Sequence, residues 1–276
     1  MNRFFKNFIT FSLFLSFIGL FLVFSLFWYF SSNLPDFKFL KTYVPPVSTK
    51  VYDIEGLGVA DFSKEKRSFI KYDQIPKKVI YAFLSAEDKN FFQHPGIDAV
   101  GITRAVIKNI QNVITGQRLE GASTITQQVA KNFLLSSDVS LARKVKEAIL
   151  AFRIEKSLSK NRILELYLNE IYLGERSYGI ASASMVYFDK SVKDLNFAES
   201  ALLAALPKAP SKYNPYRNFS TVNNRKNWVL ERMYENKYIS KKELQDSIGF
   251  KINLKKKDNN LKNDADFFIE EGTTGL

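Results

Sequence analysis

The stretch SAEDKNFFQHPG (residues 85–96) places Glu87 and Asp88 directly before two phenylalanines and His94, the only histidine of the chain. One interpretation is an ordinary helix end, with the phenylalanines turned inward and the Pro-Gly pair as a stop signal. The other is a general acid or base, because partial burial raises the pKa of a carboxyl group toward neutrality. The stretch alone leaves both interpretations open.

Composition limits the chemistry that the chain can perform. With 276 residues, of which 46% are hydrophobic, it can bury the core of one sizeable domain. The lack of cysteine in the sequence excludes disulfides, cysteine-based metal sites and a thiol nucleophile, and a single histidine excludes zinc motifs that need two. The formal net charge of +12 favours an anionic partner: a nucleic acid, an acidic membrane surface or a phosphorylated substrate.

The N-terminal region has the composition of a membrane anchor. Residues 7–35 contain no charged side chain, and residues 8–30 are mostly apolar. A helix over that apolar run would be about 34 Å long, enough to cross a bilayer core of about 30 Å, and the run is too long for a cleavable signal peptide. Arg3 and Lys6 precede it, which predicts a cytoplasmic N-terminus. We therefore expect a single-pass anchor in the cytoplasmic (inner) membrane with the main domain outside, in the periplasm, which argues against a nucleic-acid partner.

Hydrophobic periodicity predicts a mainly helical domain with a small β-hairpin annex. Residues 48–72 contain β-favouring runs, and from Ile75 onward apolar residues recur at helical spacing, first in a helix that stops at Gly116 before a polar loop. Further helices are expected at residues 124–135, 139–157, 160–172, 179–187, 193–206 and 221–236, followed by a short strand after residue 248 and a poorly structured tail. The predicted divisions are a cytoplasmic N-terminus (1–7), an anchor (8–30), a juxtamembrane linker (31–47), a main domain (48–245) and a linker or tail (246–276).

Two further stretches carry polar groups at helical positions. In EGASTITQQVAKN (120–132) a serine or threonine can cap a helix whose N-terminus would bind an anion, although an ordinary capped helix explains the same residues. In ARKVKE (142–147) Arg143 and Glu147 lie four residues apart and share a helix face. A surface ion pair worth about 0.3–0.5 kcal/mol is the simpler interpretation. The functional one is a second carboxylate held among cations that would also bind phosphate.

Four stretches, in this order and spacing, resemble peptidoglycan glycosyltransferases (glycosyltransferase family 51): EDKNFFQHPG, GASTITQQVAKN, RKVKE and KNRILELYLNEIYLG. The resemblance covers about residues 45–245, and it implies a mostly helical, lysozyme-like fold of two lobes, so that the main domain is the glycosyltransferase domain. It also implies the substrate lipid II, a disaccharide-pentapeptide on an undecaprenyl pyrophosphate. The implied products are β-1,4-linked glycan strands and undecaprenyl pyrophosphate, formed with inversion at the donor sugar.

The resemblance implies roles for individual residues. Glu87 matches the base that deprotonates the acceptor 4-hydroxyl, and Glu147 matches a second essential carboxylate on the pyrophosphate side. Substrate-binding positions are matched by Gln128, Lys131, Arg143 and Lys144 on the donor side, and by Thr124, His94 and Asp88, whose roles are more structural. Structural motif positions are matched by Phe91, Gly121, Ser123, Glu165 and Asn169. No residue is assigned as a metal ligand, although the resemblance allows Mg²⁺ or Mn²⁺ to assist at Glu147.

Features outside the four motifs distinguish the competing functions. VYDIEG and NNRKNWVLERMYENKYISKKEL resemble class A penicillin-binding proteins, in which a transpeptidase domain follows. We expect a truncated product of such a protein, for which a separate transpeptidase or proteins of the division or elongation complexes would be partners. Asp189 stands where the family has glycine, which places the local turn in question, since aspartate takes positive φ less freely. An active polymerase is preferred over an impaired remnant that binds lipid II or partners without turnover, and over a lysozyme-like lytic enzyme.

Overall fold

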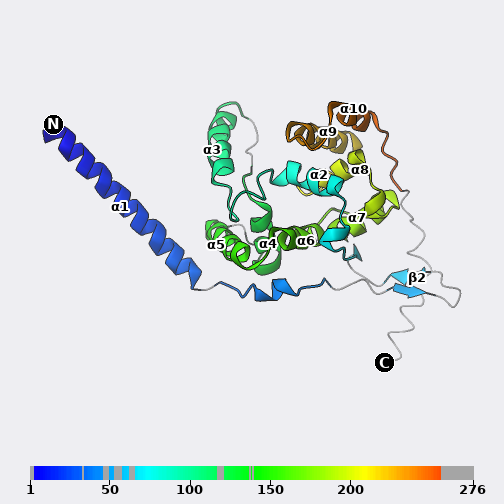
Figure 1. Cartoon of the computed structure of the whole chain (residues 1–276), viewed down its shortest axis with the longest axis horizontal. Helices are drawn as coiled ribbons and strands as arrows, with labels where there is room; N and C mark the ends of the chain where they lie inside the picture. Colours follow the sequence, from blue (N-terminus) through cyan, green and yellow to red (C-terminus); the bar gives the residue numbers. More distant parts are fainter. Residues whose placement is uncertain are drawn as a thin grey trace, which may run out of the picture. The chain divides into compact units, whose positions relative to one another are not determined.

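The chain forms two compact units in the computed structural model, Met1–Leu40 with His94–Leu158, and Lys41–Gln93 with Ser159–Leu276. The residues that the structure describes are mainly helical, which confirms the predicted fold class (Figure 1). These residues are 3–32, 34–45, 50–52, 58–61, 66–116, 121–136, 138 and 140–255. The predicted tail after residue 255 lies outside them.

The first unit contains one long apolar helix and three shorter ones: α1 (Arg3–Ser31), α3 (Ala99–Ile114), α4 (Ile125–Leu134) and α5 (Leu141–Ser157) (Figure 1). Among the described residues α1 alone is long and apolar enough to cross a membrane, with a mean hydropathy of 1.7 over Phe5–Leu22. α5 packs against α4 and also touches α1, where the Arg153 guanidinium donates to the backbone carbonyl of Ser31 at 3.2 Å.

The apolar side of α3 is exposed. Ile107 and Ile114 are 65% and 80% exposed, whereas the buried positions of this helix are small or polar. The spacing of apolar residues therefore predicted the helix correctly, but it marks an apolar surface rather than a side that packs into the core.

The second unit is built around α8 (Phe197–Ala205), which packs against α2 (Lys77–Glu87) and α9 (Phe219–Glu235). Asn196 and Glu199 form a capping box at the start of α8, and the Ala- and Leu-rich helix that follows is buried almost along its whole length. The remaining helices of this unit are α6 (Lys160–Glu170), α7 (Gly179–Phe188) and α10 (Lys241–Gly249). Short 3-10 helices are η1 (Lys38–Lys41), η2 (Tyr72–Gln74) and η3 (Val192–Asp194).

The strands of the second unit are all short. β1 (Lys50–Tyr52) and β2 (Gly58–Asp61) pair antiparallel, which confirms the predicted hairpin annex. β3 (Lys66–Arg67) pairs in parallel with β4 (Ser177–Tyr178), a contact across a long stretch of sequence that was not predicted. Arg67 reinforces it, since its guanidinium lies 4.3 Å from the ring centroid of Tyr178 and 2.6 Å from a carboxylate oxygen of Glu170.

The region around residue 248 differs from the prediction. Residues 241–249 form α10, which was not predicted, although Ser240 and Glu243 make a capping box at its start. The strand expected after residue 248 is wrong, because residues 251–255 carry no strand. The backbone N–H of Lys255 instead donates to the Tyr187 carbonyl at the end of α7, at 2.8 Å.

Asp189 adopts the left-handed turn that its position requires. It ends α7 with φ 56° and ψ 38°, and its backbone N–H donates to the Met185 carbonyl. The Asp189 carboxylate also lies 2.7 Å from the ammonium group of Lys255. The departure from glycine therefore leaves the turn intact, because aspartate is among the residues that tolerate this conformation best.

Substitutions at Asp189 should separate backbone conformation from side-chain charge. Asp189→Val should lower the free energy of unfolding by about 1–2 kcal/mol, since a β-branched side chain disfavours the left-handed region. Asp189→Asn should change it by less than about 1 kcal/mol, because the ion pair that it removes is exposed. Denaturant unfolding of the detergent-solubilised chain measures both, and equal losses would show that the ion pair, not the backbone, matters here.

Candidate active site

Glu87 is the last residue of α2, in the second unit. The helix stops there because Asp88 leaves the helical conformation, with φ −159° and ψ 79°, while its N–H still donates to the Leu84 carbonyl. Glu87 is half-buried and Asp88 is buried. The interpretation as a helix end is therefore right only in part, because α2 ends at Glu87, before the Pro-Gly pair that was expected to stop it. The partly accessible carboxylate of Glu87 is compatible with a functional role.

The aromatic residues beside this helix end have different environments. Phe91 is fully buried, whereas Phe92 is 49% exposed, so only one of the two phenylalanines turns inward. The ammonium group of Lys160, at the start of α6, lies 4.4 Å from the centroid of the Phe91 ring. A cation held over a buried ring adds positive charge to the second unit close to the motif that contains Glu87.

His94, Gly96 and Thr124 form a connected cluster in the first unit. The Thr124 hydroxyl donates to the Gly96 carbonyl at 2.7 Å and accepts from the backbone N–H of Gln127 at the start of α4. The Gly96 N–H donates to Nδ1 of His94 at 3.2 Å. These contacts support the structural roles assigned to Thr124 and His94, and Thr124, not Ser123, caps the helix.

Gly96 was not among the predicted site residues. Its φ is +99°, and a Cβ at this position would lie 2.8 Å from the carbonyl oxygen of Ala151 on α5. A side chain at position 96 is therefore excluded, both by the backbone conformation and by the lack of space.

A contact between α4 and α5 was also not predicted. The Thr126 hydroxyl donates to the Glu155 carboxylate at 2.6 Å.

Glu147 is held between two cations on α5. Its carboxylate is 1% exposed, with one oxygen 2.6 Å from the guanidinium of Arg143 and the other 2.6 Å from the ammonium of Lys144. The interpretation of Arg143–Glu147 as a surface pair is therefore wrong. Lys144 also donates to the Ser123 hydroxyl at 3.1 Å, which connects the RKVKE and GASTITQQ motifs within the first unit. Two cations around one carboxylate leave an excess of positive charge that suits an anionic ligand.

The other donor-side residues lie on or beside α4. Gln128 and Lys131 are half-buried on this helix, and Gly121 is exposed ahead of it. The described residues contain no group of three or more His, Asp or Glu side chains that could hold a metal ion. Since both oxygens of Glu147 already interact with cations, this donor set does not fit a resident metal. Assistance by Mg²⁺ or Mn²⁺ stays a prediction.

Glu165 and Asn169 attach α6 to the segment before α2. The Asn169 side-chain amide pairs with the backbone of Ile70 in both directions, each bond being 2.8 Å long. The Glu165 carboxylate accepts from the backbone N–H of Tyr72 at 2.7 Å and pairs with Arg162. Both side chains therefore satisfy backbone groups of the segment before α2, which is compatible with the structural roles that the resemblance implies.

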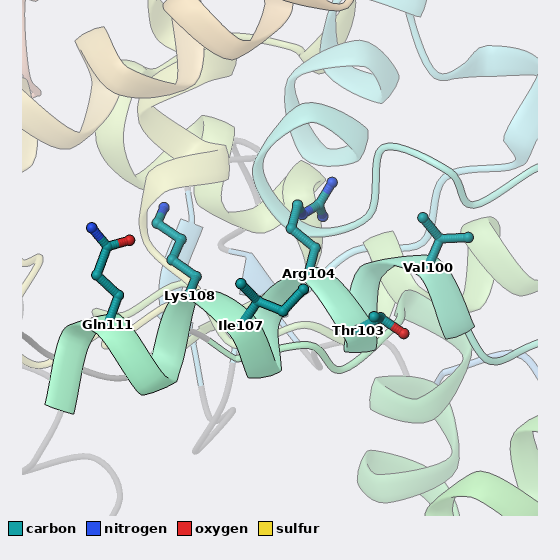
Figure 2. A pocket seen from close by; sticks show the side chains of 6 residues that line it. All are labelled: Val100, Thr103, Arg104, Ile107, Lys108 and Gln111. Atoms are coloured by element: carbon teal, nitrogen blue, oxygen red, sulfur yellow. The ribbon is translucent and has the colours of Figure 1, made fainter. Parts of the chain in front are cut away.

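A hollow of about 510 Å³ lies along α3 in the first unit. Figure 2 shows the side chains that line it: Val100, Thr103, Arg104, Ile107, Lys108 and Gln111. All six belong to one helix, and none of them is a predicted site residue. The lining of the hollow therefore contains no residue of the four motifs.

The described residues form a mainly helical fold, with a half-buried carboxylate at Glu87 in the second unit and a buried carboxylate between two cations at Glu147 in the first. The chain belongs to the transglycosylase family, whose sequence profile matches residues 55–234. It is 46% identical to penicillin-binding protein 1A of Rickettsia prowazekii over 88% of this chain and 31% of that protein. The corresponding identity to penicillin-binding protein 1A of Aquifex aeolicus is 44%, over 86% of this chain and 32% of that protein.

A solved structure of a protein with the same name is also similar to this chain. A crystal structure of penicillin-binding protein 1A from Haemophilus influenzae matches with a TM-score of 0.51 and 25% sequence identity, over 84% of this chain and 24% of that one. The chain spans about a third of the length of the curated relatives that it matches. The lysozyme-like glycosyltransferase fold expected from the sequence is consistent with this match.

Proposed function

We propose that the chain is a peptidoglycan glycosyltransferase that polymerises lipid II into β-1,4-linked glycan strands and releases undecaprenyl pyrophosphate. The observation that carries this proposal is the family match over residues 55–234, which spans both Glu87 and the buried Glu147 cluster. The relatives named penicillin-binding protein 1A support the same assignment to cell-wall synthesis.

In the proposed reaction Glu87 is the base. Its carboxylate takes the proton of the acceptor 4-hydroxyl, and the oxygen attacks C1 of the donor sugar. The bond between C1 and the diphosphate oxygen breaks, and its electron pair leaves with the diphosphate. Attack on the face opposite the leaving group inverts the sugar from α to β. Half-burial at the end of α2 supports this role, because it leaves the carboxylate accessible while withdrawing it partly from water.

The cations of the first unit would bind the donor. Lys144 is 49% exposed, so its ammonium group can reach a diphosphate while Glu147 holds it in place. Arg143 and the half-buried Lys131 add positive charge from α5 and α4. Glu147 would then orient the cations rather than act as an acid or base, since both of its oxygens are engaged.

The location follows from α1 and the nature of the substrate. We propose that α1 crosses the cytoplasmic membrane with the N-terminus inside, because Arg3 and Lys6 precede the apolar run. Lipid II is held in the membrane by its undecaprenyl chain, so an anchored enzyme meets it at the surface. The exposed apolar side of α3, in the same unit, agrees with a membrane-facing position. Transpeptidase, division or elongation partners stay a prediction.

Polymerisation of labelled lipid II by the detergent-solubilised chain tests the proposal. The expected result is a ladder of glycan strands, measured with and without a divalent cation so that metal assistance is tested in the same assay. A folded chain that binds lipid II but forms no polymer would refute the proposed activity. Release of muropeptides from purified cell wall would instead support a lytic enzyme.

Removing one donor-side cation should weaken lipid II binding. Lys131→Ala and Arg143→Ala should each lower the affinity about tenfold at low salt, because each removes a charge-assisted contact with the diphosphate. The difference from the unsubstituted chain should shrink as salt rises, since ions screen the lost attraction. Lys242→Ala, on the exposed side of α10, is the control for loss of one positive charge. An unchanged affinity for either variant would remove that residue from the donor site.

A further inference from the structure

Tyr167 has a buried hydroxyl group without a hydrogen-bond partner among the described residues. Its side chain, on α6 in the second unit, is 1% exposed, and its ring lies edge-on to Phe83 of α2 with centroids 6.2 Å apart. Within the described part of the chain its phenol oxygen has no hydrogen-bond partner. Buried polar groups are nearly always hydrogen-bonded, so an orphan hydroxyl at this position needs a reason.

The acidic end of α2 lies beside this hydroxyl. Burial raises the pKa of Tyr167 well above its ordinary value, and the charges of Glu87 and then Asp88 raise it further. Of the two carboxylates, Glu87 has the larger effect on the pKa of Tyr167. Phe83 lies one turn before Glu87 on α2, so the contact between the two rings places Tyr167 against the last turn of that helix.

Other charged groups on the neighbouring elements have different surroundings. Lys160 on α6 lies over the ring of Phe91, and Glu199 on α8 accepts from Lys190 at 2.6 Å. Lys226 on α9 is fully buried, and burial lowers its pKa. Glu87 and Asp88 are the groups whose charges act on Tyr167.

We propose that Tyr167 is a positioning residue for Glu87: its hydroxyl donates to one buried water, which in turn donates to the Glu87 carboxylate. The inference rests on the proposed function, in which Glu87 is the base. A carboxylate at the C-terminal end of a helix meets the negative end of the helix dipole, which disfavours its ionised form. A donor hydrogen bond has the opposite effect, because it stabilises the charged form. Tyr167 would thus keep Glu87 ionised and fix the direction of its oxygens.

The test is Tyr167→Phe in the full chain, with the rate of lipid II polymerisation measured against pH. Loss of the donor raises the pKa of Glu87, so the acid limb of kcat/KM should move up by about one pH unit. The rate should fall about tenfold below the limb and approach the unsubstituted value at high pH, with KM little changed. The unfolding midpoint should change little, because Glu87 is half-buried and its carboxylate can be hydrated when the donor is lost.

Tyr187→Phe is the matched control. The Tyr187 hydroxyl is also buried, but it donates to the Leu173 carbonyl at 2.8 Å. Its loss should lower the unfolding midpoint and leave the acid limb unmoved. A uniform loss of rate at every pH in Tyr167→Phe would mean that the hydroxyl acts on the fold alone, and would overturn the inference.

A second measurement separates this inference from the proposed function. Carbodiimides modify protonated carboxyl groups, so the pH midpoint of Glu87 labelling, read by mass spectrometry, follows the pKa of Glu87 without any turnover. The midpoint should move up in Tyr167→Phe by the same amount as the acid limb. If the unsubstituted chain makes no polymer, the proposed function fails while labelling still tests Tyr167. An unshifted labelling midpoint overturns the positioning role.

Discussion

Glu87→Gln is expected to reduce polymerisation of lipid II by about a hundred- to ten-thousand-fold, because an amide cannot take the proton of the acceptor hydroxyl. Glutamine has almost the same shape as glutamate, and Glu87 is half-buried at the end of α2, so the fold should persist. Lipid II binding should also persist, since the proposed donor cations belong to the other unit. Single-turnover rates and lipid II binding, measured on the same detergent preparation, check both statements.

Glu231→Gln is the control for this substitution. Glu231 is exposed on α9, in the same unit as Glu87. Its substitution by glutamine causes the same change of charge and shape. Its rate should equal that of the unsubstituted chain. If Glu87→Gln also keeps the full rate, Glu87 is not the base, and the mechanism proposed for this site is wrong.

Glu147→Gln is expected to lower the free energy of unfolding by about 2–4 kcal/mol, because it leaves two cations beside a buried neutral group. The guanidinium of Arg143 is only 13% exposed and depends on this carboxylate for a counter-charge. Lys144 is half-exposed and can turn toward water, so the expected loss of unfolding free energy is smaller than for a fully buried group of three charges. Chemical denaturation of the solubilised chain gives the value, and polymerisation should fall as the cations lose their orientation.

Two comparisons make the Glu147 prediction specific. Glu235→Gln removes the carboxylate of the exposed Arg232–Glu235 pair and should cost less than about 0.5 kcal/mol. The double variant Arg143→Ala with Glu147→Gln should lose less than the sum of its single changes, because Arg143→Ala then removes a guanidinium that Glu147→Gln has already left without its counter-charge. Additive losses would show that the two side chains do not interact as described.

Local signals predicted several helices well. The expected helices at 124–135, 139–157 and 160–172 correspond to α4, α5 and α6, and each starts after a Ser or Thr whose side chain accepts from the helix backbone. The short strand expected after residue 248 is wrong, because a strand also needs a partner with which to pair, and residues 251–255 form none. The pairing of β3 with β4 was out of reach for the same reason, since each strand has only two residues.

The sequence shows which residues of the Glu147 cluster are neighbours on a helix, but not how deeply they are buried. Spacing places Arg143 and Glu147 on one face of a helix, yet only the packing of α5 decides that Glu147 is buried. Periodicity likewise indicates nothing about Lys226, a lysine that is fully buried on α9. Burial of a charge depends on tertiary contacts, and these do not follow from a local pattern.

The contact between Arg153 and Ser31 connects α5 to the C-terminal end of α1. Arg153 caps the C-terminal end of α1 by donating to its last carbonyl, and it lies on the same helix as Glu147, which is about 9 Å away along the axis. If α1 crosses the bilayer as proposed, a residue added to it would shift the Glu147 cluster relative to the lipid surface. The number of residues in α1 would then set the distance from the membrane at which a diphosphate is bound.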